Sequence, residues 1–488
     1  MKLLLRGHDD RYAVEQLQLA LFPDEPMEPV DAPFSGDGAV SALHVGKTWL
    51  TATAELTLHG RTARASRRLR ADRADVPSRR RLLQNAYYDA AMQLRDPPEW
   101  GSLSGVRPTK LTTRCLLDGG TAKDADRLLR ERYHVSPARR RLCVEASMAT
   151  AEAVKRLEPN DVSVYIGIPF CPTRCIYCSF VSASTEKTAG LLPQYLDALI
   201  REIETVGRLL AGSGRRVRTL YIGGGTPTTL STPQIRRLMD AIRTYFDLGG
   251  LIEYTVEGGR PDTLDLEKLR AIRAGGCDRM SINPQTMNDA VLRTVGRRHT
   301  AAQTVEAFEA ARQAGFDGIN MDLIAGLPGD TPESFAASLD AVLALAPSNV
   351  TVHTLALKRG AELAMRTLAL PAAEDVRQML QDAECALRER GYAPYYLYRQ
   401  KYMSGSFENV GWCKPGYAGL YNIYMMEELH SIISLGGGAM TKINLPDGTL
   451  ERFHNPKFPQ QYLARLDDVL AQKEQAFALL RGDEKNET

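Results

Sequence analysis

The stretch YIGIPFCPTRCIYCS, residues 165–179, holds three of the chain's 8 cysteines: Cys171, Cys175 and Cys178. Cysteine thiolates are the usual ligands of a four-iron cluster, which has four iron corners to fill. Three cysteines leave one iron free to bind another molecule. The stretch therefore predicts an iron-sulfur cluster with an open coordination position where chemistry takes place.

Three close cysteines also occur in structural zinc sites, which close a tetrahedron with a fourth Cys or His. No His lies in the stretch, and the nearest other cysteines along the chain are Cys143 and Cys277. The spacing Cys-x3-Cys-x2-Cys also differs from the paired Cys-x2-Cys of zinc ribbons. A disulfide framework is disfavoured too, since 8 cysteines in 488 residues are sparse. The spacing favours a cluster.

The overall composition gives no signature of a nucleic-acid or membrane protein. With 61 basic and 59 acidic residues the net charge is +2, which is too small to favour nucleic acid or an anionic membrane. No apolar run in the sequence approaches the ~20 residues that a membrane-spanning helix requires. The opening MKLLLRG is too short for a signal sequence and is broken by Arg6, so it predicts a first β-strand. We expect the reducing cytoplasm as the compartment.

Residues 1–155 predict a separate α+β domain, in a chain whose length suits about three domains. Residues 44–58 alternate like a strand, and residues 79–94 and 124–155 show helical patterns. The arginine-rich stretch 61–81 could meet an acidic partner, but such a run more often marks a solvated face. No role for this domain follows from its sequence.

Residues 156–370 alternate between short apolar strands and amphipathic helices, which indicates parallel β/α units. Strands are expected at residues 162–168, 217–222, 252–257, 279–283, 318–324 and 349–355, and helices at residues 192–210, 233–245, 266–274, 301–314 and 332–345. The fold class is α/β, and the repeats predict a partial (β/α)6 barrel with its active site at the carboxyl ends of the strands. Residues 371–488 are expected to form a C-terminal α/β extension that covers the substrate side.

Polar residues follow several of these expected strands. GGGTPT at residues 223–228 comes directly after the second strand, and its glycines let a ligand approach the backbone. Glu257 ends the third strand, and Gln285 follows the fourth. Arg297 comes twelve residues later, and Asp322 lies in the fifth strand. Each residue alone is more often a helix cap or a surface ion pair. Together they predict one polar ligand site at the strand ends.

The cysteine stretch, the GGGTPT motif and the later polar series resemble the radical S-adenosylmethionine (radical SAM) superfamily, and more narrowly its anaerobic, oxygen-independent coproporphyrinogen III oxidase/dehydrogenase family. The resemblance spans about residues 165–356 with matching spacing. Further motifs resemble the HemZ-type branch of that family: SGVRPTK at 104–110, PYYLYRQK at 394–401, ENVGWCKPG at 408–416 and LGGGA at 435–439. Tyrosines and glycines also pack cores and turn chains, so the joint occurrence of these motifs carries the resemblance.

The resemblance implies a [4Fe-4S] cluster on Cys171, Cys175 and Cys178, with S-adenosylmethionine on the open iron as the source of a 5'-deoxyadenosyl radical. The implied contacts of the cleaved S-adenosylmethionine are Tyr165, Gly224 and Glu257. A second S-adenosylmethionine can bind nearby in this family, and its counterparts here are Tyr177, Gly225, Thr226, Gln285, Arg297, Asp322 and Ala356. The family's best-known form has His two residues after the leading tyrosine, where this chain has Gly167. The number of molecules bound, one or two, stays open.

The resemblance also implies the reaction, which is oxidative decarboxylation of two propionates of coproporphyrinogen III to vinyl groups, giving protoporphyrinogen IX in anaerobic heme biosynthesis. The hydrogen removed is unactivated, so a radical is needed where an ordinary acid or base fails. Arg and Lys side chains suit the carboxylates of a tetrapyrrole, and the candidates are Arg107, Lys110, Arg399, Lys401 and Lys414. The expected partner is a low-potential electron donor such as flavodoxin or ferredoxin, with no nucleic acid and no transmembrane segment.

Two other functions stay open. A heme chaperone of the same superfamily would carry heme without decarboxylating a porphyrinogen, and such relatives usually have a His-Asn-x-x-Tyr-Trp motif. The nearest match here, YNIYM at residues 421–425, lacks both His and Trp. A radical methyltransferase or another heme-modifying enzyme is the second alternative, and no motif excludes it.

Overall fold

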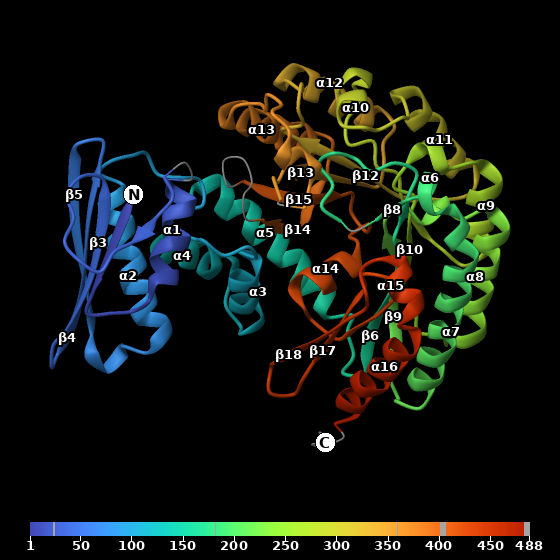
Figure 1. Ribbon diagram of the computed structural model, residues 1–488, viewed down its shortest axis with the longest axis horizontal. Coiled ribbons are helices and arrows are strands. Elements are labelled where there is room, and N and C mark those ends of the chain that lie inside the picture. Colours follow the sequence, from blue (N-terminus) through green and yellow to red (C-terminus); the bar gives the residue numbers. More distant parts are fainter. Residues whose placement is uncertain (23–24, 181, 359, 401–406, 483–488) are drawn as a thin grey trace. The chain divides into compact units, whose positions relative to one another are not determined.

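The computed structural model describes residues 1–22, 25–180, 182–358, 360–400 and 407–482 (Figure 1). The chain divides into two compact units, Met1–Val144 and Glu145–Thr488. No helix in the described ranges is both long and apolar enough to cross a membrane. The expected division into residues 1–155, 156–370 and 371–488 stays a prediction.

The first unit is built on a five-stranded sheet in the order β2-β1-β3-β4-β5. Its strands are β1 (Lys2–Arg6), β2 (Glu28–Pro29), β3 (Gly38–Val45), β4 (Trp49–Leu58) and β5 (Arg61–Arg70). Its helices are α1 (Arg11–Leu21), α2 (Val76–Ala91), α3 (Thr109–Leu117) and α4 (Ala122–Tyr133). Leu17 of α1 and Tyr87 of α2 share one hydrophobic core with Leu56 of β4. Alternate residues of β4 therefore face the helices.

The first strand falls where the opening residues predict it, but two other expectations for this region are wrong. Residues 44–58 do not form one strand, because the chain bends at residues 46–48 and β3 pairs antiparallel with β4. The helix expected at residues 124–155 is two helices, α4 and α5 (Pro137–Val154). His134 ends α4 with a left-handed backbone (φ 58°), and the proline ring at position 137 suits only the start of the next helix.

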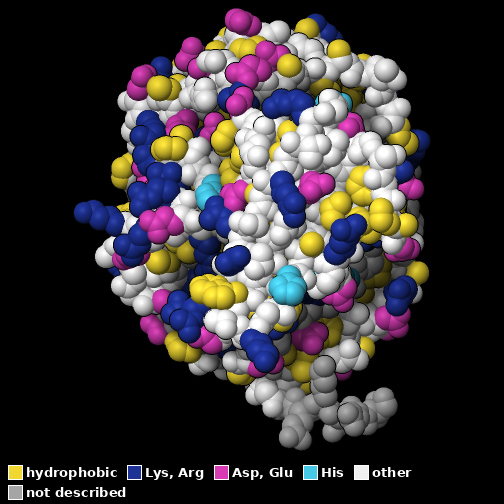
Figure 2. Space-filling view, turned by 90° about the vertical axis from the view of Figure 1, so that its left-hand side faces the viewer, with side chains coloured by type: hydrophobic (Ala, Val, Ile, Leu, Met, Phe, Trp, Pro, Cys, Tyr) yellow, Lys and Arg dark blue, Asp and Glu magenta, His cyan; other side chains and the backbone are white. Residues whose placement is uncertain are grey.

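The arginine-rich strand β5 is mostly exposed along its length. Figure 2 shows basic and acidic side chains interspersed on one face of the molecule. Several arginines of this region form ion pairs with nearby carboxylates, such as Arg67 with Asp89 and Arg80 with Asp10 (2.8 Å). The stretch therefore has the solvated character that its sequence predicts.

The second unit is built on an eleven-stranded sheet, whose central strands run parallel in the order β13-β12-β11-β10-β9-β6. They are β6 (Asp161–Ile168), β9 (Arg216–Gly224), β10 (Glu253–Glu257), β11 (Arg279–Ser281), β12 (Gly318–Ala325) and β13 (Asn349–Thr354). The connecting helices are α7 (Leu192–Ala211), α8 (Thr232–Tyr245), α9 (Leu266–Ala274), α10 (Asp289–Thr294), α11 (Ala301–Gln313) and α12 (Pro332–Ala344). Figure 1 shows α7, α8, α9 and α11 along the outer side of this sheet. The predicted partial (β/α)6 barrel is confirmed.

Strands of the C-terminal segment extend this sheet at both ends. At one end β15 (Glu408–Cys413) pairs antiparallel with β13 and with β14 (Ala393–Arg399). At the other end β16 (Ile432–Leu435) runs parallel to β6 and is followed by β17 (Met440–Asn444) and β18 (Leu450–His454). The helices of the segment are α13 (Ala373–Glu389), α14 (Leu420–Glu427), α15 (Pro459–Ala464) and α16 (Leu466–Arg481). The segment is an α/β extension of the barrel sheet.

A buried polar network joins α7 to α16. The side chains of Glu202 and Lys473 are both 0% exposed and form an ion pair at 3.3 Å. Glu202 also accepts hydrogen bonds from the Gly436 amide (2.8 Å) and the Tyr462 hydroxyl (2.6 Å). Asn455 donates to Glu202 (2.9 Å) and accepts from Lys473 (3.0 Å). Because each charge has several hydrogen-bond partners, the network holds α16 against the barrel without a stranded charge.

Candidate active site

A cavity of about 340 Å³ lies at the carboxyl ends of the parallel strands. Barrel active sites are built at this end of the strands. Every predicted cluster or S-adenosylmethionine residue except Tyr165 lines it: Cys171, Cys175, Tyr177, Cys178, Gly224, Gly225, Thr226, Glu257, Gln285, Arg297, Asp322 and Ala356. The fold thus gathers residues that are far apart in the sequence around one space.

The cysteine stretch forms one wall of this cavity. Its first cysteine lies in β7 (Phe170–Cys171), which pairs with β8 (Ala183–Ser184) ahead of the short helix α6 (Thr185–Thr188). The Cys178 amide donates to the Cys175 carbonyl (3.0 Å), which closes a turn between these two cysteines. Thr226 Oγ1 donates to the sulfur of Cys171 (3.5 Å). The stretch is therefore fixed by backbone pairing and by the GGGTPT motif.

The three cysteine thiols are free; Cys175 is buried, and Cys171 and Cys178 are half-buried. Burial raises the pKa of Cys171, and it raises the pKa of Cys178 to about 11. Buried thiolates therefore need positive charge, which a metal cluster supplies. Each thiolate of a four-iron cluster binds a different iron, so the three stand further apart than the ligands of one ion. In the described parts of the chain, no three His, Cys, Asp or Glu side chains gather closely enough to hold a single ion. The all-sulfur donor set fits the predicted cluster.

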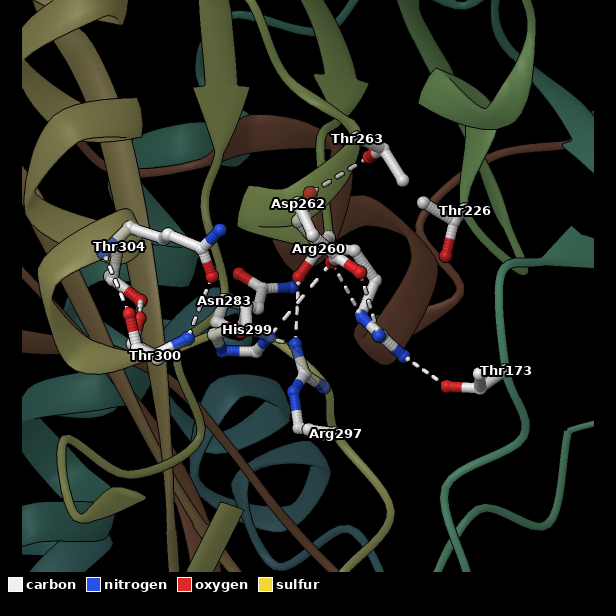
Figure 3. Close-up of polar contacts among 12 residues, drawn as sticks. Thr173, Thr226, Arg260, Asp262, Thr263, Asn283, Arg297, His299, Thr300 and Thr304 are labelled. Atoms are coloured by element: carbon white, nitrogen blue, oxygen red, sulfur yellow. Dashed lines mark hydrogen bonds and ion pairs between the residues drawn. The ribbon is translucent and has the colours of Figure 1, made fainter. Parts of the chain in front are cut away.

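Two buried guanidinium groups lie beside the thiol of Cys175, and Figure 3 shows how Arg260 and Arg297 converge from neighbouring loops. Nη1 of each arginine is 4.0 Å from Cys175 Sγ. Arg297 also donates to the Tyr177 hydroxyl (3.1 Å) and to the Asn283 carbonyl (2.6 Å). Nearby positive charge favours the thiolate form of a cysteine. The wall that carries the cysteines is therefore cationic.

The glycines of the GGGTPT motif bring the backbone close to this wall. A Cβ at Gly225 would lie 2.5 Å from the Phe170 carbonyl oxygen, and one at Gly223 would lie 2.7 Å from Glu257 Oε2. Gly224 has a φ of 114°, and its amide lies 3.3 Å from the same carboxylate oxygen. Space requires glycine at two positions and backbone conformation requires it at the third. A ligand can therefore approach the main chain here.

Tyr165 is not among the residues that line the cavity. Its ring stacks with Tyr221 (centroids 6.2 Å apart) and with Tyr421 (6.3 Å). Tyr165 pairs with Tyr221 in the register of β6 and β9, which places the two rings side by side on one face. Tyr221 is the member of this stack that lines the cavity. The contact of Tyr165 with S-adenosylmethionine stays a prediction.

A second wall of the cavity is acidic. Burial, aided by the charge of Asp322, raises the pKa of Glu257 from 4.5 to about 7. Burial alone would also raise the pKa of Asp322, but hydrogen bonding and charge from His353 hold it below its usual value. His353 Nε2 is 3.7 Å from Asp322 Oδ2, and Asn320 donates to Oδ1 (2.7 Å). Two neighbouring carboxyl groups therefore differ in their affinity for a proton.

No motif in the sequence points to His353. Only its position near the carboxyl end of the strand expected at residues 349–355 could have indicated it, since such ends carry active-site groups in barrels. Sequence reasoning also missed Arg260, which follows the third expected strand closely but belongs to none of the motifs. Both residues line the cavity.

Three residues at the end of β11 carry polar atoms without a partner. Ser281 Oγ, Asn283 Oδ1 and Gln285 Oε1 are buried, line the cavity and have no hydrogen-bond partner among the residues that the structure describes. Gln285 has a left-handed backbone (φ 69°) and bridges to Leu323 of β12. An unpaired buried polar atom costs about 1–3 kcal/mol. This row of oxygens therefore fits a polar ligand such as S-adenosylmethionine.

Two of the predicted carboxylate-binding residues, Arg399 and Lys414, do not line the cavity. Arg399 faces Glu408 across the pair β14 and β15, burial lowers its pKa to about 10, and it does not line the cavity. Lys414 also lies away from it, since its ammonium donates to the Arg390 carbonyl. Lys401 lies outside the described residues. Arg107 and Lys110 belong to the first unit, and their role stays a prediction. The cavity has other basic lining residues, among them Arg174 and Lys358.

The β/α sheet, the three-cysteine wall and the glycine motif define the fold and site of a radical SAM protein. A family model described as "Radical SAM superfamily" matches residues 165–342. Members of this superfamily bind a [4Fe-4S] cluster and S-adenosylmethionine. The solved structure of coproporphyrinogen III oxidase (HemN) from Escherichia coli, which is described as a radical SAM enzyme, is similar with a TM-score of 0.52 and 27% sequence identity, covering 69% of this chain and 79% of that one.

Sequence relatives show to which group of radical SAM proteins the chain is similar. The oxygen-independent coproporphyrinogen-III oxidase-like protein HemZ of Bacillus subtilis is 40% identical over 382 residues, 77% of this chain and 76% of that protein. The heme chaperone HemW of Lactococcus lactis is 32% identical over 286 residues, 58% of this chain and 69% of that protein. The oxygen-independent coproporphyrinogen III oxidase of Escherichia coli is 36% identical over 247 residues, 50% and 53% of the two chains. The chain belongs to the radical SAM superfamily and, within it, to the HemZ-like, oxygen-independent coproporphyrinogen-III oxidase-like proteins.

Proposed function

We propose that this protein oxidatively decarboxylates two propionates of coproporphyrinogen III to vinyl groups and so forms protoporphyrinogen IX. The observation that carries the proposal is the union of the cysteine wall and the acidic wall in one cavity. The names of the HemZ and coproporphyrinogen III oxidase relatives support it. When bound, the cluster and S-adenosylmethionine supply a primary carbon radical that removes an unactivated hydrogen atom. Each propionate then loses carbon dioxide and one electron as its vinyl group forms.

The residues of this chain bind, orient and shield the reactants in this proposal. Cys171, Cys175 and Cys178 hold the cluster. The predicted contacts of S-adenosylmethionine keep their assignments, and the unpaired oxygens of Ser281 and Asn283 join them because they accept hydrogen bonds from an ammonium or hydroxyl group. The proposed partner is a low-potential electron donor such as flavodoxin or ferredoxin. The proposed compartment is the reducing cytoplasm.

Arg174 and Lys358 bind propionate groups of the substrate in this proposal. Both side chains line the cavity, whereas Arg399 and Lys414 do not. Guanidinium and ammonium groups form charge-assisted hydrogen bonds with carboxylates, which are stronger than bonds between neutral groups. The acidic wall would repel a propionate, so the charges of the two regions orient the substrate.

Heme carriage is the second candidate function. Several relatives carry the name heme chaperone HemW, and one of them is 32% identical over 286 residues. A chaperone would bind heme in stoichiometric amount and release it unchanged. The two candidates therefore differ in their products, which makes them separable by one set of assays.

An anaerobic assay tests the proposed function. The full chain is reconstituted with iron and sulfide, then mixed with a reductant, S-adenosylmethionine and coproporphyrinogen III. We expect protoporphyrinogen IX, carbon dioxide and 5'-deoxyadenosine. Formation of 5'-deoxyadenosine without the other two products would falsify the assignment. Tight heme binding without turnover would favour the chaperone, and methylated product with S-adenosylhomocysteine would favour a methyltransferase.

A further inference from the structure

Arg260 is a buried arginine that lies between the cysteine stretch and a carboxylate (Figure 3). Its side chain forms a two-pronged ion pair with Asp262, in which Nε donates to Oδ1 (3.0 Å) and Nη2 donates to Oδ2 (2.9 Å). The remaining terminal nitrogen, Nη1, donates to Thr173 Oγ1 (3.0 Å) and lies 4.0 Å from the sulfur of Cys175. Only 3% of the residue is exposed. The guanidinium group of Arg260 therefore contacts two parts of the site, the Asp262 carboxylate and the cysteine stretch.

The backbone around Arg260 leaves this side chain little freedom. The residue follows β10 and precedes a 3-10 turn at Pro261–Thr263, and its carbonyl accepts a hydrogen bond from the Thr263 hydroxyl (2.7 Å). The amides of Gly258 and Gly259 both bond to the Ser281 carbonyl (2.9 and 3.1 Å). These hydrogen bonds hold the backbone on both sides of Arg260. In this position Nε and Nη2 contact Asp262, and Nη1 contacts the cysteine stretch.

The group behind Asp262 adds no compensating charge. His299 Nδ1 is 3.9 Å from Asp262 Oδ1, and its side chain is 0% exposed. Burial and the nearby charges of Arg297 and Arg260 lower the pKa of His299 to about 3, so the imidazole is neutral at physiological pH. One carboxylate thus faces Arg260, while Arg297 adds a second positive charge at the same sulfur. The immediate surroundings of Cys175 carry net positive charge.

We propose that Arg260, oriented by Asp262, is a positioning residue that sets the reduction potential of the cluster held by Cys171, Cys175 and Cys178. Reduction adds one electron, taken from the low-potential donor, and changes no bond to the protein. The reduced cluster with its three thiolates is one unit more negative than the oxidised one. A fixed, buried guanidinium stabilises the more negative state, since charges interact strongly where water is excluded. Hydrogen bonds and charge near the sulfurs are established determinants of cluster potentials.

The alternative for Arg260 is a purely structural one, in which it ties Thr173 and the loop in place. The electrostatic and the structural role of Arg260 predict different effects of a lysine at this position. Lysine keeps the positive charge but cannot form the two-pronged pair, whereas methionine keeps the bulk and removes the charge. The proposal rests on the cluster and not on coproporphyrinogen as substrate, so it is tested without substrate.

The test is a redox titration of the reconstituted full chain, with dithionite and mediators, followed by visible absorption and electron paramagnetic resonance. We expect Arg260→Met to make reduction about tenfold less favourable, which is about 59 mV for one electron. Arg260→Lys should stay within about threefold of wild type. Asp262→Asn should shift the equilibrium in the opposite direction from Arg260→Met, because it removes a negative charge. The matched control is Arg236→Met, which removes an exposed arginine paired with Glu267 (3.2 Å) and should leave the potential unchanged.

Iron content and the potential together decide the outcome. Full iron content with an unchanged potential in Arg260→Met overturns the proposal, as does an equal shift in Arg260→Met and Arg260→Lys. If Arg260→Met holds no cluster, Asp262→Asn decides, since a wild-type potential in that variant also overturns the proposal. Neither measurement involves the decarboxylation assay, so a failure here is distinct from a failure of the proposed function.

Discussion

Two buried polar clusters of the second unit are satisfied to very different degrees. In the network of Glu202, Lys473, Tyr462 and Asn455, the buried side-chain oxygens and nitrogens have partners, and the two charges neutralise each other. At the end of β11, the oxygens of Ser281, Asn283 and Gln285 have no partner among the described residues. Both clusters are shielded from water, so only the second bears the penalty of unpaired polar groups. Full pairing marks a structural network, and unpaired atoms that line a cavity mark a place for a ligand.

The largest expected effect falls on the cavity. Cys175→Ser replaces a proposed cluster ligand with a poor one, so we expect iron content to fall and S-adenosylmethionine cleavage to drop to background. Iron analysis, visible absorption and 5'-deoxyadenosine formation measure this. Cys385 is exposed, and Cys385→Ser should match wild type in all three. Retention of a full cluster and activity by Cys175→Ser would contradict the assignment of this wall.

A substitution in the network of Glu202 and Lys473 should change the stability of the protein rather than its catalytic activity. Lys473→Met leaves the Glu202 carboxylate buried without its counter-charge, which is expected to lower the free energy of unfolding by about 3–5 kcal/mol. Chemical denaturation of the apo-protein measures it. The exposed pair Arg237 and Asp197 (2.6 Å) provides the control, since Arg237→Met should cost less than about 1 kcal/mol. If Lys473→Met costs no more than that control, the network is not the structural element that its pairing indicates.

Glu257 belongs to the cavity but has a stability signature of its own. The folded protein keeps the Glu257 proton up to about pH 7, whereas the free carboxyl group loses it near pH 4.5. The wild type therefore loses stability as the pH rises through this window, by up to about 3 kcal/mol. Glu257→Gln cannot titrate, so it should gain on the wild type between pH 4.5 and pH 8.

Denaturation of the apo-protein at several pH values checks this difference. The exposed Glu267→Gln variant, which disrupts the pair with Arg236, is the control and should follow the wild type across the range. A constant difference between Glu257→Gln and wild type from pH 4.5 to pH 8 would show that folding does not raise the pKa of this carboxyl group. The acidic wall would then hold two carboxylates at neutral pH.

The parts of this molecule that the sequence predicts are those set by local patterns. The central strands and their helices follow from apolar periodicity, and the cysteine stretch and strand-end residues follow from spacing along the chain. Pairings between distant segments are different. The stack of Tyr165, Tyr221 and Tyr421 depends on the register of β6 with β9 and on the position of α14, and neither leaves a local pattern.

The same limit explains the misplaced Arg399 and the missed His353. Arg399 lies opposite Glu408 because β14 and β15 pair antiparallel, and motif likeness cannot reveal which face of a strand is buried. His353 approaches Asp322 because β12 and β13 are neighbours in the sheet. In the first unit, a short bend at residues 46–48 is enough to turn one expected strand into a hairpin. Each error concerns the geometry between segments rather than their composition.

Two buried asparagines test the difference between paired and unpaired polar groups most directly, and they give the smallest expected effect. Asn283 is 5% exposed and Asn349 is 0% exposed. Asn349 is fully engaged, since it donates to the Tyr417 carbonyl (2.7 Å) and accepts from Arg279 (2.9 Å). Asn283 Oδ1 has no partner in the described structure. Asn349→Ala should therefore destabilise the protein by about 2–3 kcal/mol, whereas Asn283→Ala should change the free energy of unfolding by less than about 1 kcal/mol.

Ligand binding should reverse this order. If Asn283 serves S-adenosylmethionine, Asn283→Ala should weaken its binding to the reconstituted protein about tenfold, which corresponds to about one hydrogen bond. Asn349→Ala should leave the affinity unchanged in the folded fraction, because its partners are all within the protein. Equilibrium dialysis with labelled S-adenosylmethionine measures both variants beside the denaturation curves. An Asn283→Ala variant that loses as much stability as Asn349→Ala and no affinity would show that the unpaired oxygens mark no ligand site, and the contrast between the two clusters would fail.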